Sequence, residues 1–368
     1  MAGKKIRIGM IGVGQIGKYH IENYQKIPDA EIVVLADINE KEGRHVSEIY
    51  GIPNVYTDFR QLLERDDIEA VDVCLHNNLH APITVAALKA GKHVYCEKPM
   101  AGAYHDAAVM METARSTKKR LSIQLSTLFT KETRAAKILI DGGQLGKIYY
   151  ARATGFRRRG RPFVDGYGAP AFVQKRIAGG GALYDMGVYH IANILYLLGN
   201  PEVHRISGKT FQMIEMDAAR KELGNYDVEE LGLGFVRCKG EIVLDIIEAW
   251  AIILNPFEGS SIVGSEGGIR LQPFSFHKNF GDLEMDTTIN LDSADYRWHT
   301  LSEDGDAFDS PQQHWVAALC GRVELLPTAE IALNTMLVSE GIYLSDKLGR
   351  EVATDEVIKS SKSTAIKL

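Results

Sequence analysis

The sequence predicts an α/β protein with two domains: a doubly wound parallel sheet, followed by an α/β domain whose sheet is open and mainly antiparallel. Three observations support this. The chain has 368 residues, and a domain usually holds roughly 100–200. Up to about residue 125, short apolar runs alternate with helical patterns, as in parallel sheets covered on both faces. From about residue 147, longer strands of alternating polarity follow one another through short turns, which favours antiparallel pairing.

The first domain, residues 1–125, is expected to alternate strands and helices. Pro28 stops the first helix because proline cannot continue the backbone hydrogen-bonding pattern. Gly91 ends the third helix, as glycine commonly does. The expected strands are 6–11, 31–36, 71–75, 93–96 and 121–125. The expected helices are 15–27, 58–65, 81–90 and 103–117.

The second domain, residues 126–368, is expected to open with an amphipathic helix over 131–141 that Gly142 and Gly143 close. A second helix lies between two glycine signals, Gly179–Gly181 and Gly199. The expected strands are 148–156, 203–211, 230–238, 241–253 and 261–271.

Composition and charge narrow the possible function. Hydrophobic residues make up 45% and charged residues 24%, which argues against disorder, collagen and coiled coil. The net charge of -6 argues against a nucleic-acid-binding or membrane-surface protein. Four distant cysteines have no metal-binding spacing, so we expect no metal site and free thiols in a reducing compartment. No run approaches the about 18 apolar residues of a membrane span, so we expect a cytoplasmic protein.

Glycine is in excess: it makes up 35 of the 368 residues, or about 9.5%, against an average of about 7%. Three of these glycines have an evident task. They form a G-x-G-x-x-G motif between the first strand and the first helix, with Gln15 and Ile16 inside it. Gly12 permits the tight turn, Gly14 lets a pyrophosphate approach the backbone, and Gly17 lets helix and strand pack closely. The helix N-terminus then offers N–H groups to the phosphates. The motif therefore predicts a dinucleotide site.

Asp37 lies 20 residues beyond Gly17, directly after the second strand. A carboxylate at this place accepts hydrogen bonds from the adenosine ribose and repels a 2′-phosphate. No arginine follows it, so NAD is favoured over NADP as the cofactor. The alternative is that Asp37 is the N-cap of the next helix, and the two roles are compatible.

Glu97, Lys98 and Pro99 follow the strand 93–96. In a doubly wound sheet ligands sit at the carboxyl ends of the strands, so Lys98 is placed to reach the nicotinamide end of the cofactor. Pro99 sets the turn, and its peptide bond is a candidate for the cis form. The alternative is an ordinary surface turn.

The helix after Gly179–Gly181 carries a polar stripe on an otherwise apolar surface. Asp185, Tyr189 and Asn193 are spaced four residues apart and share a face, while His190 lies about 100° round the helix from Tyr189. A polar stripe on an apolar helix costs free energy unless it is paired or functional. The alternative is a polar edge that faces solvent.

A dense basic loop, Arg157–Arg161, follows the first strand of the second domain, and Arg176 adds to it. Arginine suits planar recognition of a carboxylate or stacking on an aromatic ring. We expect either contact with the substrate, through Arg158, or contact with a neighbouring subunit's cofactor. The alternative is a solvated loop or an oligomer contact.

Taken together, the glycine motif, the Glu97-Lys98-Pro99 turn and the glycine-rich helix with Asp185 resemble the Gfo/Idh/MocA family of oxidoreductases. The resemblance extends over residues 5–352. Weaker matches agree with it: Leu79-His80-Ala81-Pro82, Ala90–Val94, Leu145–Ile148, Gly264–Gly268, and His314-Trp315 before a final helix pair with Pro327.

The resemblance implies an N-terminal Rossmann doubly wound parallel sheet and a C-terminal α/β domain whose open sheet often forms an oligomer interface. We therefore expect a homo-oligomer. It also implies NAD(P)-dependent oxidation or reduction at a ring carbon of a sugar, inositol or related polyol. Residues expected to contact the cofactor are Gly12, Gly14, Gln15, Ile16, Gly17, Asp37, Asn77, His80, Glu97 and Lys98.

By the same resemblance, Lys98 orients and polarises the substrate hydroxyl and Asp185 hydrogen-bonds the substrate. Four residues beyond Asp185 many members carry a histidine as acid/base, and some a tyrosine. This sequence has Tyr189, with His190 beside it. Facing favours Tyr189, whose pKa of about 10 would have to be lowered by Lys98, whereas His190 needs no such help. The catalytic set is therefore Lys98, Asp185 and either Tyr189 or His190.

A second departure is His76-Asn77-Asn78, where the family usually has Thr-Pro-Asn. These residues follow a strand and are expected to line the nicotinamide side. His76 either adds a titratable group there or only hydrogen-bonds cofactor or backbone.

The resulting hypothesis is an NAD-dependent sugar or glycoside dehydrogenase, with C3 of a glucosyl unit as a specific possibility. Substrate contacts are expected from Lys98, Arg158, Asp185 and Tyr189. Three alternatives stay open: an inositol or free-sugar dehydrogenase, a redox-assisted glycosidase in which NAD transiently oxidises the sugar, and a non-catalytic NAD-binding regulator.

Overall fold

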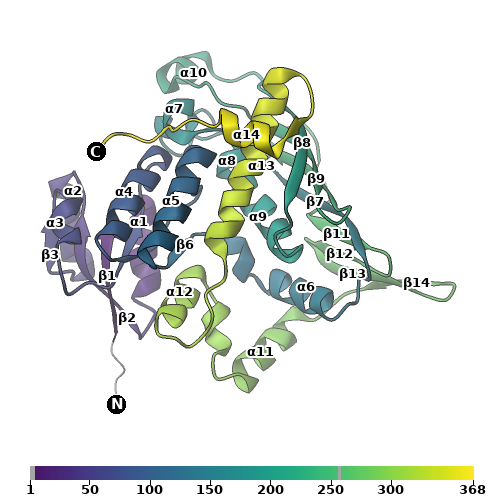
Figure 1. Cartoon of the computed structure of the whole chain (residues 1–368), viewed down its shortest axis with the longest axis horizontal. Coiled ribbons are helices and arrows are strands. Elements are labelled where there is room, and N and C mark those ends of the chain that lie inside the picture. Colours follow the sequence, from purple (N-terminus) through teal and green to yellow (C-terminus); the bar gives the residue numbers. More distant parts are fainter. Residues whose placement is uncertain (1–4, 256–257) are drawn as a thin grey trace.

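The computed structural model describes residues 5–255 and 258–368, in which two sheets lie on either side of a long helix. The helix is α13 (Thr328–Leu348), and Figure 1 shows it between the six-stranded sheet at the left and the nine-stranded sheet at the right. Two sheets of different topology confirm the predicted fold class.

The first sheet has the order β3-β2-β1-β4-β5-β6, and each neighbouring pair is parallel. The order reverses between β1 and β4, which is the place where a doubly wound sheet binds its ligand. The strands are β1 (Ile6–Ile11), β2 (Ala30–Ala36), β3 (Asn54–Tyr56), β4 (Ala70–Val73), β5 (His93–Cys96) and β6 (Leu121–Ile123).

Helices cover both faces of this sheet, as the continuous apolar strands predict. They are α1 (Gln15–Tyr24), α2 (Glu40–Tyr50), α3 (Phe59–Leu63), α4 (Asn77–Lys89) and α5 (Tyr104–Thr117). The first helix ends at Tyr24, before the expected residue 27. Sequence reasoning gave no bounds for α2 and β3, since α2 buries only Gly43 and Val46 and β3 buries no residue completely.

The second sheet has the order β14-β13-β12-β11-β7-β10-β9-β8-β15, and only β7 and β10 pair in parallel. The expected strand 261–271 is two strands joined by a turn, because Gly264–Gly268 reverses the chain. The strands are β7 (Ile148–Phe156), β8 (Val203–Phe211), β9 (Leu231–Cys238), β10 (Val243–Ala249), β11 (Ser261–Gly264), β12 (Gly268–Leu271), β13 (Phe274–Phe280), β14 (Leu283–Thr287) and β15 (Val352–Ala353).

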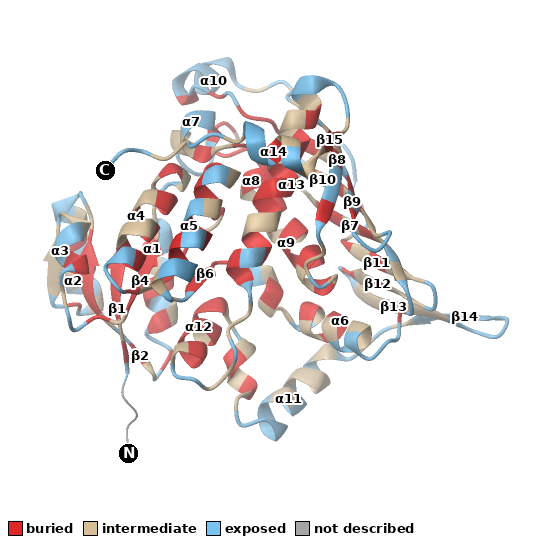
Figure 2. Ribbon diagram, viewed as in Figure 1, coloured by how far each residue is buried: buried red, intermediate tan, exposed pale blue. Residues whose placement is uncertain are grey.

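One face of the second sheet is packed against helices, and Figure 2 shows the buried residues gathered there on α9 and α13. The helices of this region are α6 (Lys131–Asp141), α7 (Lys175–Ala178), α8 (Ala182–Asp185), α9 (Gly187–Leu197), α10 (Ala218–Gly224), α11 (Leu291–Leu301), α12 (Pro311–Leu319), α13 and α14 (Thr354–Ser360). Single 3-10 turns lie at Ser126–Phe129, Pro170–Val173 and Gly305–Phe308.

The chain after residue 310 returns to the first sheet. Trp315 of α12 is fully buried, and its ring centroid lies 6.0 Å from that of Tyr95 on β5. Helix α13 packs against α5 and β6 as well as against β8. The division into 1–125 and 126–368 stays a prediction, and α12 shares the core of the first sheet. Among the described residues, no helix is long and apolar enough to cross a membrane.

Candidate active site

The glycine turn between β1 and α1 has the geometry that a dinucleotide requires. Gly12 has φ +91°, and a Cβ there would lie 2.3 Å from the carbonyl oxygen of Cys74. A Cβ on Gly17 would lie 2.2 Å from the carbonyl oxygen of Gly12. Around Gly14, by contrast, no described atom lies within 4 Å of an added Cβ. Gln15 and Ile16 are exposed beside it, so the first turn of α1 is open to a phosphate.

Asp37 lies at the edge of this turn. Its Oδ2 accepts a hydrogen bond of 2.9 Å from the backbone N–H of Val13, and its Oδ1 accepts one of 2.8 Å from Asn39. The N-cap of α2 is Asn39, whose Oδ1 accepts from the N–H of Glu42 at 3.2 Å. The alternative role for Asp37 as the N-cap is therefore wrong, and its carboxylate lies beside the glycine turn.

Lys98 lies where β5 ends, before a cis peptide bond to Pro99. Its Nζ donates to Oδ1 and to the backbone oxygen of Asp185, both at 2.9 Å. Burial disfavours the charge on this ammonium, but the nearby Asp185, Tyr189 and Glu97 outweigh burial and raise its pKa. The turn is therefore not an ordinary surface turn, because it carries a charged lysine into contact with the second domain.

Asp185 receives two donors, Lys98 from the first domain and Trp250 from the second. The indole Nε1 of Trp250 donates to Oδ2 at 2.9 Å. Burial raises the pKa of the Asp185 carboxyl, but Lys98 outweighs burial and holds that pKa below its ordinary value. The aspartate is thus ionised, with each carboxylate oxygen in a defined place.

The helix that carries the polar stripe is not continuous. It is divided into α8 and α9 at Met186, whose oxygen accepts from the N–H of Tyr189 at 3.1 Å. The third member of the stripe, Asn193, is buried and accepts from the hydroxyl of Thr133 at 3.1 Å. The stripe therefore separates into a site half, Asp185 and Tyr189, and a structural half.

Tyr189 lies against Lys98, whose Nζ is 4.8 Å from the centre of the phenol ring. Burial raises the pKa of this phenol, and the opposing effect of Lys98 is smaller, so the pKa lies above its ordinary value. The expectation that Lys98 lowers the pKa of Tyr189 is therefore wrong for the net effect, although the lysine acts in the expected direction.

His190 has a partner that sequence reasoning missed. Its Nδ1 lies 3.0 and 3.1 Å from the two carboxylate oxygens of Glu248, which is fully buried on β10. Burial disfavours the imidazolium, but Glu248 outweighs burial and raises the pKa of His190. Gly155 on β7 makes room, since a Cβ there would lie 2.0 Å from the His190 ring. The sequence feature that could have revealed this partner is the acidic Glu248 within a mainly apolar strand.

Glu229 is a second buried acid that sequence reasoning missed. Its two carboxylate oxygens accept from the N–H groups of Gly181 and Leu183, at 2.9 and 3.0 Å. The hydroxyl of Tyr343 on α13 also donates to it at 2.8 Å. Since these contacts hold the start of α8, Glu229 positions Asp185 at the end of that helix.

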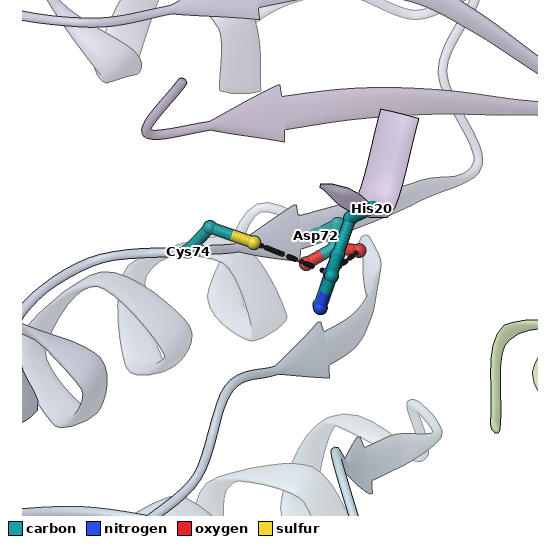
Figure 3. A group of neighbouring side chains, drawn as sticks. All are labelled: His20, Asp72 and Cys74. Atoms are coloured by element: carbon teal, nitrogen blue, oxygen red, sulfur yellow. Dashed lines mark hydrogen bonds and ion pairs between the residues drawn. The ribbon is translucent and has the colours of Figure 1, made fainter. Parts of the chain in front are cut away.

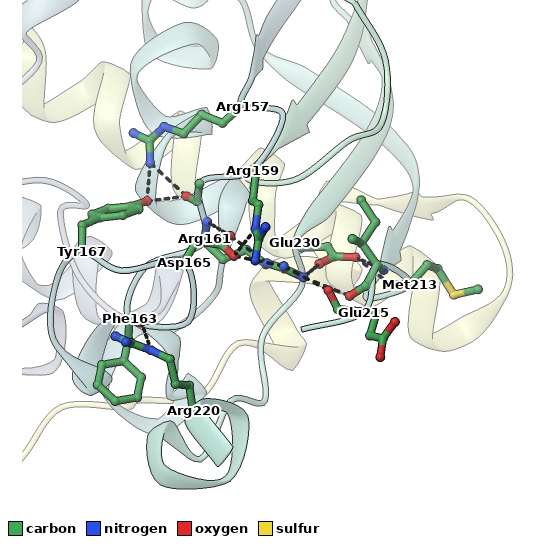
Figure 4. A network of polar contacts seen from close by, with 12 residues as sticks. Arg157, Arg159, Arg161, Phe163, Asp165, Tyr167, Met213, Glu215, Arg220 and Glu230 are labelled. Carbon is green, nitrogen blue, oxygen red and sulfur yellow. Dashed lines mark hydrogen bonds and ion pairs between the residues drawn. The ribbon is translucent and has the colours of Figure 1, made fainter. Parts of the chain in front are cut away.

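The basic loop divides into structural and available arginines (Figure 4). Arg161 is buried and donates to Asp165, Glu230 and two backbone oxygens, so it braces the loop. Arg159 pairs with Asp165 at 3.3 Å. The solvated-loop alternative is thus wrong for Arg161.

Arg157 is the arginine of this loop that borders the site. Its guanidinium donates to the hydroxyl of Tyr167 and to the oxygen of Gly160. Burial raises the pKa of Asp185, and Arg157 adds to the larger lowering effects of Lys98 and Trp250. Arg157 and Arg158, the expected substrate contact, are both exposed. Of the two, Arg157 is the one that acts on the pKa of Asp185, and the substrate contact of Arg158 stays a prediction.

Three of the expected cofactor contacts are engaged within the protein. His80 is buried, with its ring nitrogens 2.7 and 3.0 Å from the oxygens of Pro99 and Leu75, so no ring nitrogen is left for a ligand. Asn77 donates to the oxygen of Ala178 at 2.7 Å. Glu97 accepts from the N–H of Lys98 at 2.9 Å. These residues shape the site, and His76 packs its ring against Phe172.

A glycine cradle for a dinucleotide, together with Lys98 at the carboxyl end of β5 paired with Asp185 at the end of α8, indicates an NAD-binding oxidoreductase. Residues 6–125 match the family model described as an oxidoreductase family with an NAD-binding Rossmann fold, and residues 133–270 match the Gfo/Idh/MocA C-terminal domain. The chain belongs to the Gfo/Idh/MocA family. The predictions of the family and of NAD as cofactor are confirmed.

Curated relatives match most of the chain. It is 30% identical to the D-glucoside 3-dehydrogenase of Escherichia coli K12 over 362 residues, 96% of this chain and 98% of that one. It is also 30% identical to the myo-inositol 2-dehydrogenase of Thermotoga maritima over 286 residues, 78% of each chain. The fold is similar to that of levoglucosan dehydrogenase in complex with NADH, with a TM-score of 0.78, 20% identity, and coverage of 95% and 99%.

Proposed function

We propose that the protein is an NAD-dependent dehydrogenase that oxidises a ring carbinol of a sugar or glycoside, with C3 of a glucosyl unit as the first candidate. The observation that carries this proposal is the contact of the Lys98 ammonium with Asp185 at the end of β5. The similarity to the glucoside 3-dehydrogenase over 96% of the chain supports the choice of substrate.

Each half of this pair has a separate task. The Lys98 ammonium donates to the substrate hydroxyl and favours its ionised form, since a positive charge stabilises a developing alkoxide. Asp185, ionised and held by Trp250, accepts a hydrogen bond from a second hydroxyl and sets the orientation of the ring. The bound nicotinamide supplies the hydride acceptor.

His190 and Tyr189 are the candidates for the proton acceptor, and the contacts of each support His190. Glu248 stands beside His190 Nδ1, at 3.0 Å, where it stabilises the imidazolium that forms when the other ring nitrogen takes a proton. A buried carboxylate in this place also selects the tautomer with the proton on Nδ1. Tyr189, with a raised pKa, then helps to position Lys98 through its ring.

Arg157, braced by Tyr167, takes the role of substrate contact that the sequence assigned to Arg158. Its guanidinium stands at the end of β7, two residues beyond Gly155, which faces His190. Side chains two apart on a strand share a face, so Arg157 points to the same side as the proton acceptor. Its free N–H groups are available to oxygens of the sugar.

A cyclic polyol such as an inositol is the second candidate substrate, because the myo-inositol 2-dehydrogenase is 30% identical over 78% of the chain. A ring carbinol without an anomeric centre would use the same lysine, aspartate and base. The two candidates differ only in what lies beyond the reacting carbinol, where Arg157 stands.

We also propose a homo-oligomer formed through the open face of the second sheet. That face carries the exposed Phe235, 42% accessible, on β9. Sedimentation of the wild type and of Phe235→Glu tests the interface, and a monomeric wild type contradicts it.

We also propose a cytoplasmic location, because the four cysteines are free thiols, which suits a reducing compartment.

The deciding experiment is a screen of glycosides, free sugars and inositols for NADH formation, with Lys98→Ala as the inactive control. NADH accumulation with intact glycoside supports the proposed dehydrogenase. Released aglycone without net NADH identifies the redox-assisted glycosidase and overturns the proposal. Full turnover by Lys98→Ala contradicts the assigned role of the lysine, and no turnover of any compound by the wild type favours a non-catalytic NAD-binding regulator.

A further inference from the structure

His20 occupies a buried position that the dinucleotide motif and the catalytic pair do not explain. It lies on α1, three residues beyond Gly17, and its side chain is completely inaccessible to solvent. Its Nδ1 is 2.8 Å from Oδ2 of Asp72, and its Nε2 is 2.9 Å from Oε1 of Glu97. Both neighbours are carboxylates: Asp72 lies on β4 and Glu97 directly follows β5, and these are the two strands that follow the switch in strand order.

Two carboxylates around one imidazole determine its protonation state. A neutral imidazole has one N–H and can donate to only one of them, whereas an imidazolium donates to both. Since an ionised carboxylate only accepts, hydrogen bonds to both carboxylates need hydrogen on both ring nitrogens of His20. Burial disfavours that charge, but Asp72 outweighs burial and raises the pKa of His20. In return, His20 outweighs the effect of burial on Glu97 and lowers its pKa.

The remaining groups around His20 add no second cation. Cys74, directly after β4, donates from Sγ to Oδ1 of Asp72 at 3.3 Å, and its Sγ lies 3.3 Å from His20 Nδ1 (Figure 3). Burial raises the pKa of this thiol, so it stays neutral. The ring centroids of Tyr95 on β5 and Tyr19 on α1 lie 5.8 and 6.2 Å from that of His20. The hydroxyl of Tyr24, also on α1, is near Asp72.

Glu97 connects His20 to the turn that carries Lys98. Its Oε1 meets His20, while its Oε2 accepts from the backbone N–H of Lys98 at 2.9 Å. Lys98 then reaches Asp185 through its ammonium. A continuous line of polar contacts thus runs from the helix that opens the cofactor site, through a buried carboxylate, to the lysine that meets the substrate.

We propose that His20 is a positioning residue, held as an imidazolium between Asp72 and Glu97, that locks the turn carrying Lys98 to the helix at the cofactor site. This proposal rests on the proposed function only for the role of Lys98. The clamp fixes where the ammonium stands relative to a cofactor bound at the N-terminus of the same helix. A misplaced ammonium would slow hydride transfer more than it would weaken cofactor binding.

The first test measures the protonation state of the His20 ring directly and needs no substrate. In the full chain labelled at histidine, nitrogen-15 NMR is recorded about two units above the ordinary histidine pKa of about 6.5. We expect both ring nitrogens of His20 to carry hydrogen there, and His20→Gln assigns the signal. A single N–H would overturn the proposal. One bound equivalent of zinc, lost in His20→Gln, would also overturn it, because His20, Asp72 and Cys74 would then be metal ligands.

The second test reads the positioning. His20→Gln and Glu97→Gln are each expected to lower kcat roughly tenfold to a hundredfold, while NADH affinity, measured by fluorescence titration, stays within about threefold. His45→Gln, at an exposed histidine on α2, is the matched control. If His20 acts through Glu97, the double variant is no slower than the slower single variant. Independent multiplying effects, or a loss of NADH affinity that equals the loss of kcat, would refute the proposal.

Discussion

The Glu248→Gln variant separates the two candidates for the proton acceptor. Glu248 is fully buried, and its carboxylate lies 3.0 Å from His190 Nδ1. Glutamine keeps the shape of the side chain and its acceptor oxygen but removes the charge. A hydrogen bond to a charged group contributes about 1.5–3 kcal/mol, and each 1.4 kcal/mol is about tenfold in rate. We therefore expect kcat/KM at high pH to fall roughly 10- to 150-fold if His190 becomes an imidazolium in the transition state.

The pH dependence of kcat/KM is expected to shift in a defined direction when Glu248 is replaced. Oxidation requires an unprotonated base, so kcat/KM falls in acid through the pKa of that base. Glu248 outweighs burial and holds the pKa of His190 above its ordinary value, so the wild-type acid limb lies above that value. Without the carboxylate the limb moves to lower pH, and the two profiles converge in acid.

The assay is the initial rate of NADH formation across the pH range in which both proteins are folded. Glu241→Gln is the matched control, because Glu241 is 81% exposed at the turn before β10. The reasoning is refuted if Glu248→Gln leaves both the limb and the plateau unchanged. In that case loss of turnover in Tyr189→Phe, with the limb near the pKa of a phenol, would assign the proton to Tyr189.

Four further outcomes are expected. Lys98→Met lowers kcat by at least about a hundredfold and leaves NADH binding intact by fluorescence titration; retained turnover contradicts its role. Asp37→Ala weakens NADH at least about tenfold and improves NADPH relative to it; tighter NADPH binding by the wild type would overturn the assignment. Arg157→Ala raises KM for the sugar about tenfold, whereas Arg158→Ala, in the same loop, does not, and equal effects would contradict the choice. Gly17→Ala lowers both Tm and NADH affinity, because its Cβ would lie 2.2 Å from a carbonyl oxygen; unchanged binding would count against the cradle.

Local patterns carried much of the fold. The helix 131–141 and the strands 6–11, 93–96, 148–156 and 203–211 have the bounds that periodicity and turn residues predicted. Such elements depend on contacts between near neighbours in the chain. Several elements had no predicted bounds, among them α2, which buries only Gly43 and Val46, and β3, which has three residues and buries none of them completely. The division at Met186 between α8 and α9 was also hidden, because Glu229, more than 40 residues away, holds the start of α8.

The candidate site divides in the same way. The glycine turn and Asp37 are predictable because a strand, a tight turn and a helix N-terminus form one local unit, and the spacing of 20 residues follows from its size. The functions of Lys98 and Asp185 came from resemblance, since 87 residues separate them and no local pattern joins them.

By itself, the sequence determined the class of fold, the cofactor cradle and the list of polar residues available for chemistry. Only the tertiary structure decided which of these polar residues lie within hydrogen-bond distance of one another. Glu248 meets His190 because β10 lies beside β7 under α9, and His20 stands between Asp72 and Glu97 because β4 and β5 are neighbouring parallel strands. A buried carboxylate acts through whatever lies within hydrogen-bond distance, and strand register and helix packing set that distance.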